Sequence, residues 1–118
     1  MRANKSGTII NVTSIAGLRA LPLAGSSYCA SKFGMNSLGS MINKEESEHG
    51  IRCTNICPGE VVTEILDKRQ SPPTAKERER MVMPEDVAKI AIMVAKMPPR
   101  VIIPSITVTG RSTIDLCC

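Results

Sequence analysis

Short runs of β-branched residues, separated by a long helix-like stretch, are the feature that most restricts how this chain can fold. Two of these runs occupy residues 8–13 and 51–57, and the stretch between them ends at Gly50. Runs this short and this aliphatic are typical of strands in a parallel sheet that is covered on both faces. Parallel neighbours require a long crossover connection, which a helix between the runs would supply. The sequence therefore predicts an α/β fold with a parallel sheet.

The stretch between the two runs is expected to form one long helix, from about Ser27 to His49. Ser26 or Ser27 is the expected N-cap, because a serine hydroxyl accepts a hydrogen bond from a free amide in the first helical turn. Gly50 is expected to end the helix, because glycine adopts the left-handed conformation that closes a helix without steric strain.

Beyond the second run, residues 63–83 are polar and contain proline, which predicts a mobile flap with a short helical turn. The alternating charges of residues 76–80 within it are typical of a solvated surface rather than of a phosphate-binding patch. Pro84 opens a further helix with an apolar face, Pro98 ends it, and residues 106–109 are expected to form the last strand.

The composition excludes several classes of function. The chain holds one Tyr, one Phe and no Trp among 118 residues, so a nucleic-acid surface built on stacked aromatic rings is not expected. Its 15 basic and 11 acidic side chains leave a formal net charge of +4, which by itself identifies no partner. No apolar run approaches the roughly 20 residues that a membrane-spanning helix needs. We therefore expect neither a nucleic-acid partner nor a membrane span.

The five cysteines follow no disulfide framework and no secretory leader is expected, so the predicted location is a reducing compartment, the cytoplasm. On one strand Cys53 and Cys57 would lie about 13 Å apart at roughly 3.3 Å per residue, too far for a disulfide. They are interpreted as core residues. Cys117 and Cys118 do not match a prenylation motif and are interpreted as part of a terminal tail.

Tyr28 and Lys32 are the pair of side chains with the clearest chemical use. They are four residues apart near the start of the expected helix, which places both on one face with Cβ atoms roughly 5–6 Å apart. An ammonium about 5 Å from a phenol stabilises the phenolate by roughly 3 kcal/mol at an effective dielectric of about 20. The positive end of the helix adds up to about 1 kcal/mol. The pair suits proton transfer, although the same spacing also arises by chance in helices.

Ser14 stands at the carboxyl end of the first expected strand, fourteen residues before Tyr28. Open α/β sheets place their ligand sites beyond the carboxyl ends of strands. A serine at this position either serves such a site or caps a turn. Ser14 is therefore a candidate for the same site as Tyr28.

Three motifs at this spacing resemble the short-chain dehydrogenase/reductase (SDR) family. They are GTIINVTSIAG at residues 7–17, YCASKFG at residues 28–34 and PGEVVT at residues 58–63. The sequence PEDVA at residues 84–88 is also similar to the family, so the resemblance covers nearly the whole chain. It implies a Rossmann-like doubly wound parallel sheet and an NAD(P)-dependent oxidoreductase that interconverts a hydroxyl and a carbonyl group.

The resemblance also implies roles for individual residues. Tyr28 is expected to act as the general acid/base that passes a proton to a carbonyl oxygen while hydride reaches its carbon. Lys32 is expected to favour the ionised phenol and to hold the nicotinamide ribose. Ser14 is expected to hydrogen-bond the substrate oxygen and to stabilise the charge that develops on it.

Cofactor contacts are likewise implied after the second strand. Pro58 and Gly59 are expected to turn the chain past the nicotinamide. The Val61 backbone is expected to meet the carboxamide, and Thr63 the carboxamide or the pyrophosphate. The implied cofactor is NADP or NAD, with NADP favoured because residues 97–104 resemble relatives that use it. The implied partner is a small-molecule carbonyl or alcohol, and no metal is expected.

The chain departs from the family in one respect. It contains no glycine-rich turn between a strand and a helix, which the pyrophosphate of a dinucleotide needs. We therefore interpret residues 1–118 as the carboxyl-terminal half of an SDR-type NAD(P)-binding Rossmann domain, a partial sheet whose amino-terminal half is absent. Because the phosphate-binding turn is missing and a half-sheet leaves a strand edge unpaired, we expect the isolated chain to be catalytically incompetent or only marginally folded.

A second function, from another class, stays open. A truncated half-domain without catalysis would act through dimerisation by the long helix at residues 27–49, whose family counterpart often forms a dimer interface. A change in NAD(P)H fluorescence on mixing would favour the enzyme. Dimerisation without cofactor binding would favour the alternative.

Overall fold

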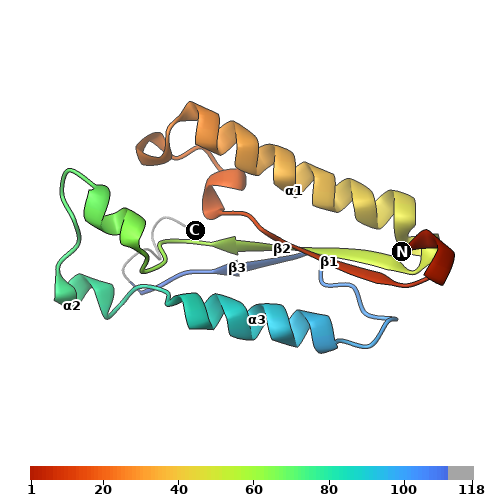
Figure 1. Cartoon of the computed structure of the whole chain (residues 1–118). Coiled ribbons are helices and arrows are strands. Elements are labelled where there is room, and N and C mark those ends of the chain that lie inside the picture. The colour runs from red at the N-terminus through yellow and green to blue at the C-terminus, as the bar shows by residue number, and fades with distance from the viewer. Residues whose placement is uncertain (112–118) are drawn as a thin grey trace.

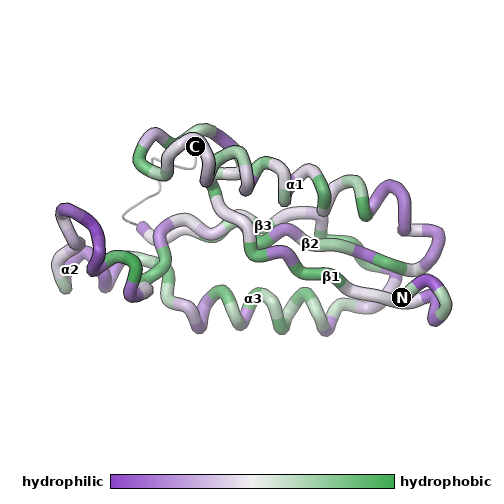
Figure 2. The backbone as a smooth tube through the Cα atoms, turned by 45° about the horizontal axis from the view of Figure 1, so that its top comes forward, coloured by the Kyte–Doolittle hydropathy of each residue, from purple (hydrophilic) through white to green (hydrophobic). Residues whose placement is uncertain are grey.

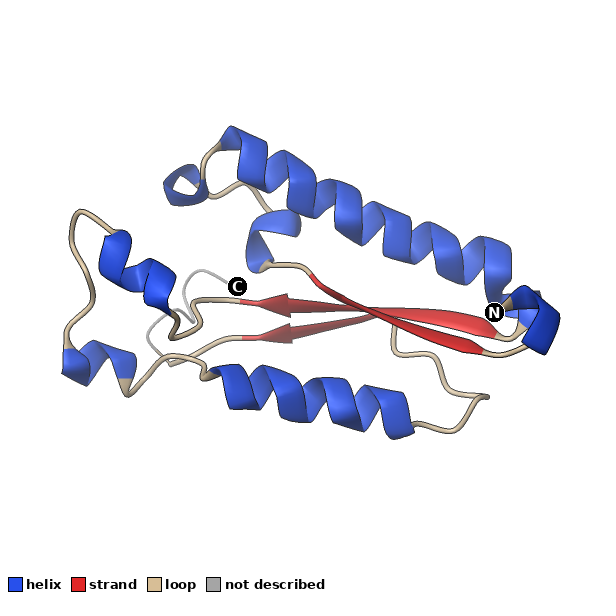
Figure 3. Ribbon diagram, in the orientation of Figure 1, coloured by secondary structure: helices blue, strands red, loops and turns tan. Residues whose placement is uncertain are grey.

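Three parallel strands form the sheet of this protein, as the sequence predicts. In the computed structural model, which describes residues 1–111, strand β1 (Gly7–Val12) pairs with β2 (Ile51–Pro58), and β2 pairs with β3 (Ser105–Val108). All three strands run in the same direction, so their carboxyl ends lie at one edge of the sheet (Figure 3). The partial α/β sheet expected from the sequence is confirmed.

Helices cover both faces of the sheet. Helix α1 (Ser26–Glu46) lies over one face and α3 (Pro84–Lys96) over the other (Figure 1). A short helix, α2 (Ala75–Arg78), lies in the connection between β2 and α3. The other helical elements are short 3₁₀ turns: η1 (Arg2–Asn4), η2 (Ile15–Gly17), η3 (Pro22–Ala24), η4 (Ser47–His49) and η5 (Glu64–Lys68).

Several element boundaries differ from the sequence prediction by one to three residues: β1 begins and ends one residue earlier, β2 extends to Pro58, and the long helix is α-helical only to Glu46, with the 3₁₀ turn η4 after it. The N-cap of α1 is Gly25, not Ser26 or Ser27, and neither serine hydroxyl caps the helix. Gly25 has a φ of 81°, a conformation that a residue without a Cβ adopts most easily, so the backbone turns into the helix one residue early. The last strand runs from Ser105 to Val108, one residue earlier than predicted, because its pairing with β2 sets its bounds.

The core lies along β2, all of whose residues are buried. Ile56 and Cys57 are fully inaccessible and Cys53 nearly so. Both cysteines carry free thiols, as predicted for core residues, and burial raises the pKa of the Cys53 thiol. The core is aliphatic because the single Tyr and the single Phe of the chain are both exposed. Cys117 and Cys118 lie outside the described residues.

Polar residues gather in the connection between β2 and α3, as the hydropathy colouring of Figure 2 shows around α2. The alternating charges of residues 76–80 are mostly exposed there, which agrees with a solvated surface. By contrast, α3 places Val94 in the core against the sheet. The chain therefore divides into a packed sheet layer and a polar connection beyond its carboxyl edge.

Gly50 joins α1 to β2 in a conformation that only glycine adopts without strain. Its φ is 69°, and a Cβ at this position would lie 2.2 Å from the carbonyl oxygen of Lys5. Its own carbonyl accepts a hydrogen bond from the amide of Gly7, where the pairing of β1 and β2 begins. Gly50 thus ends the helical segment, as predicted, and also fits against the start of β1.

Gly50→Ala is expected to lower the free energy of unfolding by about 2–4 kcal/mol, because it combines a strained φ with overlap against backbone. Gly34→Ala is the matched control, since an added Cβ at Gly34 meets no atom within 4 Å. Alanine also favours a helix interior over glycine. Urea denaturation followed by circular dichroism compares the two variants, and equal stabilities would contradict the assignment.

Candidate functional site

Ser14, Tyr28 and Lys32, here called the Tyr28 group, lie around one corner at the carboxyl edge of the sheet. β1 ends at Val12, and the chain then turns through η2, which begins directly after Ser14. Helix α1 starts near this turn, and Tyr28 lies in its first turn (Figure 1). One strand end and one helix start therefore position the whole group.

Lys32 connects the helix to the strand. Its Nζ lies 5.5 Å from the centroid of the Tyr28 ring, as the four-residue spacing predicts. The same nitrogen donates a hydrogen bond to the Val12 carbonyl at 3.2 Å. An ammonium has three N–H donors, so two remain for other acceptors. The Tyr28 side chain is 45% exposed and is therefore open to a ligand that approaches from solvent.

The Ser14 hydroxyl has a structural partner as well as a chemical use. Its Oγ accepts a hydrogen bond from the Ala16 amide at 3.1 Å and thereby caps η2. The turn-capping interpretation is therefore correct. Capping occupies the oxygen as an acceptor and leaves the O–H as a donor. Ser14 can consequently cap its turn and donate to a ligand oxygen at the same time.

The electrostatic environment of Tyr28 favours negative charge. The first turn of α1 contains no acidic residue, and its free amides carry the positive end of the helix dipole. The ammonium of Lys32 adds a full positive charge one turn further along the helix. A negatively charged ligand atom beside the Tyr28 ring would be stabilised at this position.

The second predicted group, residues 58–63, follows β2 at the same edge of the sheet. The Gly59 amide donates to the Val108 carbonyl of β3 at 2.8 Å. The Thr63 hydroxyl donates to the Val61 carbonyl at 3.5 Å, and Thr63 leads into η5. Within residues 1–111, no hydrogen bond joins this group to the Tyr28 group. The two groups share the edge but belong to neighbouring strands.

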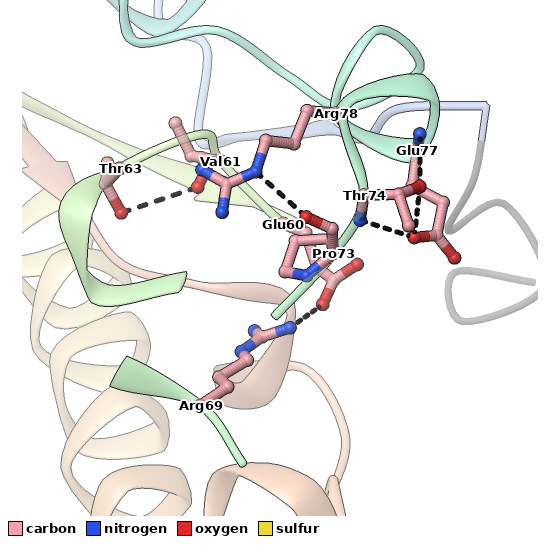
Figure 4. Close-up of polar contacts among 8 residues, drawn as sticks. All are labelled: Glu60, Val61, Thr63, Arg69, Pro73, Thr74, Glu77 and Arg78. Atoms are coloured by element: carbon pink, nitrogen blue, oxygen red, sulfur yellow. Dashed lines mark hydrogen bonds and ion pairs between the residues drawn. The ribbon is translucent and has the colours of Figure 1, made fainter. Parts of the chain in front are cut away.

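Ion pairs hold the connection between β2 and α3 in place. Arg69 donates to the carboxylate of Glu60 at 2.6 Å (Figure 4). Arg78 pairs with Asp67. No sequence pattern indicated either pair, because the partners lie nine and eleven residues apart, more than one helical turn. These pairs restrain the proposed flap on the side of the sheet edge.

A capping box starts α2 in the same connection. The Glu77 carboxylate accepts hydrogen bonds from the Thr74 amide at 2.7 Å and the Thr74 hydroxyl at 2.8 Å (Figure 4). These bonds hold the pKa of Glu77 below its ordinary value. A threonine followed three residues later by glutamate is a recognisable capping signature, so this feature was accessible from sequence.

Two hollows flank this connection. One of about 260 Å³ lies among Glu60, Arg69 and residues 71–73. The other, of about 630 Å³, runs along residues 79–82 and 108–111. Neither hollow is lined by the Tyr28 group.

Residues 1–111 contain no group of three or more His, Cys, Asp or Glu side chains arranged to hold a metal ion. None of their helices is both long and apolar enough to cross a membrane.

Comparisons with known proteins agree with the motifs. The short chain dehydrogenase family matches residues 1–74, more than half of the chain. Protein FixR of Bradyrhizobium diazoefficiens is 41% identical over 92 residues, which cover 72% of this chain and 31% of FixR. The 3-oxoacyl-[acyl-carrier-protein] reductase FabG of Rickettsia felis is 33% identical over 104 residues, which cover 80% of this chain and 41% of that reductase.

Solved structures show the same fold. A β-ketoacyl-[ACP] reductase (FabG) from Bacteroides thetaiotaomicron matches 98% of this chain and 46% of its own, with a TM-score of 0.76 and 29% identity. A serine dehydrogenase complexed with NADP⁺ and 4-hydroxyisoleucine dehydrogenase complexed with NADH match at TM-scores of 0.76 and 0.73, with 26% and 25% identity. They match 93% and 94% of this chain, and 46% and 48% of their own. The chain thus spans less than half the length of these relatives. Together the motifs, the family match and the shared fold show that the chain belongs to the short-chain dehydrogenase/reductase family.

Proposed function

We propose that this protein is an oxidoreductase that interconverts a hydroxyl and a carbonyl group with NAD(P)(H), and that residues 1–118 supply the carboxyl-terminal half of its domain. The observation that carries the proposal is the position of Lys32. Its ammonium lies 5.5 Å from the Tyr28 ring and 3.2 Å from the Val12 carbonyl at a strand end. The Tyr28 phenol and the Lys32 ammonium therefore lie together at the carboxyl ends of the strands, where α/β sheets bind ligands.

Tyr28 is the proton donor in this mechanism, with Ser14 and Lys32 as the other catalytic residues. In reduction, the Tyr28 hydroxyl gives its proton to the carbonyl oxygen while the carbonyl carbon receives a hydride, so that C=O becomes H–C–OH. When bound, the reduced nicotinamide supplies that hydride and its electron pair. Ser14 donates its O–H to the same oxygen and stabilises the developing charge. Lys32 and the positive end of α1 stabilise the phenolate that remains.

Lys32 and residues 58–63 fit the nicotinamide end of the cofactor by their chemistry. One N–H of Lys32 is used on the Val12 carbonyl, and the remaining two suit the ribose hydroxyls. Pro58 and Gly59 would form the turn past the nicotinamide, with the Val61 backbone and the Thr63 hydroxyl toward its carboxamide. We propose NADP as the preferred cofactor and NAD as the alternative.

The polar connection at residues 63–83 is proposed to close over a small carbonyl or alcohol substrate. Its ion pair between Arg69 and Glu60 is partly exposed and therefore contributes little net stability, so it can open at low cost. The similarity to 3-oxoacyl reductases makes a 3-oxoacyl thioester the first substrate to test.

The test supplies the other half of a domain in trans. The 118-residue chain is co-expressed with the amino-terminal part of the Bacteroides thetaiotaomicron reductase, and the complex is purified. Oxidation of NADPH and of NADH is then followed with acetoacetyl-CoA as the carbonyl probe. We expect carbonyl-dependent oxidation by the complex and by neither part alone. A complex that binds NADPH but oxidises none would overturn the proposal.

A second candidate function is association with another copy of the chain, and the outer side of α1 favours it. Leu38 is 60% exposed, and Phe33 and Met41 are exposed on the same helix. Apolar side chains gathered on one exposed surface mark association sites. If this face forms a dimer, it is the interface that the sequence predicts at residues 27–49.

Leu38→Glu is expected to shift a dimer to monomer in sedimentation velocity, because it places a charge within an apolar contact. Ile65→Glu is the matched control, since Ile65 is also an exposed aliphatic residue but lies in η5. A wild-type chain that sediments as a monomer at all concentrations would rule out this second function.

The proposed location is the cytoplasm. The described cysteines, Cys29, Cys53 and Cys57, are all buried and carry free thiols, as is usual in a reducing compartment. We also propose that the protein has no nucleic-acid partner.

A further inference from the structure

Gly17 lies directly against the helix that carries Tyr28 and Lys32. A Cβ at Gly17 would be 2.6 Å from the carbonyl oxygen of Lys32 and 2.7 Å from its carbonyl carbon. Both are backbone atoms, so no side-chain rotation can make room for it. The φ of Gly17 is not positive. Glycine is therefore required here for close approach and not for backbone conformation.

The contact at Gly17 belongs to a closed ring of contacts around the site. The Gly17 amide donates to the Ser14 carbonyl at 2.9 Å, and the Ala16 amide donates to the Ser14 hydroxyl oxygen at 3.1 Å. Ser14 lies two residues after Val12, and the Val12 carbonyl accepts the hydrogen bond from Lys32 Nζ at 3.2 Å. The ring closes where Gly17 touches the Lys32 backbone.

The ring of contacts fixes the distance between the turn η2 and helix α1, because its members are tightly packed. All three residues of η2 are buried, so the turn cannot swing into solvent to relieve a clash. A methyl group on Gly17 would fall short of ordinary contact by about 0.8 Å, the difference between 2.6 and 3.4 Å. The turn and α1 would have to separate by a similar amount. A displacement near 1 Å at a catalytic centre lowers rates by about 10²-fold.

We infer that Gly17 is a positioning residue that sets the distance from Ser14 to the Tyr28–Lys32 pair. Its catalytic meaning rests on the proposed function. The geometric part stands on the contacts of Gly17 with the Lys32 backbone and can be measured independently of turnover.

Gly17→Ala tests the geometric part, with Gly34→Ala as the matched control because a Cβ at Gly34 meets no atom within 4 Å. Lysine is isotopically labelled, and the Lys32 side-chain resonances are assigned by their loss in Lys32→Arg. The hydrogen bond to the Val12 carbonyl fixes the Lys32 side chain with Nζ 5.5 Å from the Tyr28 ring centroid, where the ring current shifts its resonances. A separation of the turn from α1 would lengthen that bond and free the side chain to move away from the ring. We expect the chemical shifts of the Lys32 side chain to move toward the values of exposed lysines in Gly17→Ala and to stay unchanged in Gly34→Ala. Unchanged resonances in folded Gly17→Ala would overturn the inference.

A second variant guards against poor folding of Gly17→Ala. The added Cβ would also lie 2.6 Å from the side-chain nitrogen Nδ2 of Asn36. Within residues 1–111 this nitrogen atom is buried and has no hydrogen-bond partner. Adding Asn36→Ala removes this overlap and keeps the overlap with the Lys32 carbonyl, so the Lys32 shift is expected to persist. Wild-type resonances in the double variant would overturn the inference, as would loss of the fold in both variants.

Activity provides the catalytic arm in the complex with the Bacteroides thetaiotaomicron part. There Gly17→Ala is expected to lower kcat by about 10²-fold, whereas Gly34→Ala stays near the wild type. Equal kcat values for the two variants would overturn the positioning role. Inactivity of the wild-type complex would instead overturn the proposed function, and the lysine resonances would still decide whether Gly17 positions Lys32.

Discussion

Tyr28→Phe is expected to lower the carbonyl-reducing activity of the reconstituted complex by at least about 10²-fold, because it deletes the proton that the mechanism transfers. The ring itself remains to pack beneath the Lys32 ammonium. Tyr28 is half exposed, and among the described residues no hydrogen bond of its hydroxyl is found. The free energy of unfolding should therefore change little.

Initial rates of NADPH oxidation and far-ultraviolet circular dichroism measure the two expectations. Ser40→Ala is the matched control, because it also deletes an exposed hydroxyl from α1, one that within residues 1–111 bonds only the Asn36 carbonyl of its own helix. The chain has one Tyr and no Trp, so tyrosine fluorescence of the purified chain reports Tyr28 alone. A Tyr28→Phe complex as active as the Ser40→Ala complex would show that another group transfers the proton.

Arg52→Met is expected to lower the free energy of unfolding by about 2–4 kcal/mol, since it leaves several partly buried acceptors without their charged donor. Arg52 is 7% exposed, and its guanidinium donates to the carbonyls of Met97, Pro98 and Val101 at 2.6–2.9 Å. It also donates to the Thr8 hydroxyl at 3.0 Å. One side chain of β2 thus joins β1 to the end of α3.

Urea denaturation checks this prediction against Arg100→Met, which removes an exposed arginine from the same loop and should cost less than about 0.5 kcal/mol. Arg52→Lys is expected to lie between the two, because an ammonium keeps the charge but has fewer donors than a guanidinium. Equal stabilities of Arg52→Met and Arg100→Met would mean that the carbonyls find other partners.

Local chemistry explains why some elements were predictable. Gly50 ends the helical segment and residues 51–57 form a strand because φ preference and β-branching act within a few residues of the chain. The prediction of the N-cap was wrong, because it considered only which side chains can accept a hydrogen bond from the first helical turn. The helix instead begins after Gly25, whose positive φ turns the backbone into the first helical residue without a capping side chain.

Contacts between distant segments were not predictable from patterns. Nothing in the sequence around Arg52 indicates that its charged side chain is buried. It is buried because the turn after α3 folds back onto β2. The same holds for Gly17, which was part of a recognised motif but carried no role until α1 was seen to lie on it. The contacts that give these residues their roles, Arg52 with the carbonyls of Met97, Pro98 and Val101 and Gly17 with the Lys32 backbone, join segments far apart in the sequence.

The sequence by itself determined the family, the α/β class and the placement of Tyr28 and Lys32 on one helical face, because helical periodicity and motif spacing are properties of the chain. Only the tertiary structure decided that Lys32 reaches the Val12 carbonyl, that the Ser14 oxygen is already used as a cap, and that α1 rests on Gly17. These contacts depend on how closely a strand end and a helix start approach each other. That approach is set by the packing of the whole sheet against α1, and no short stretch of sequence encodes it.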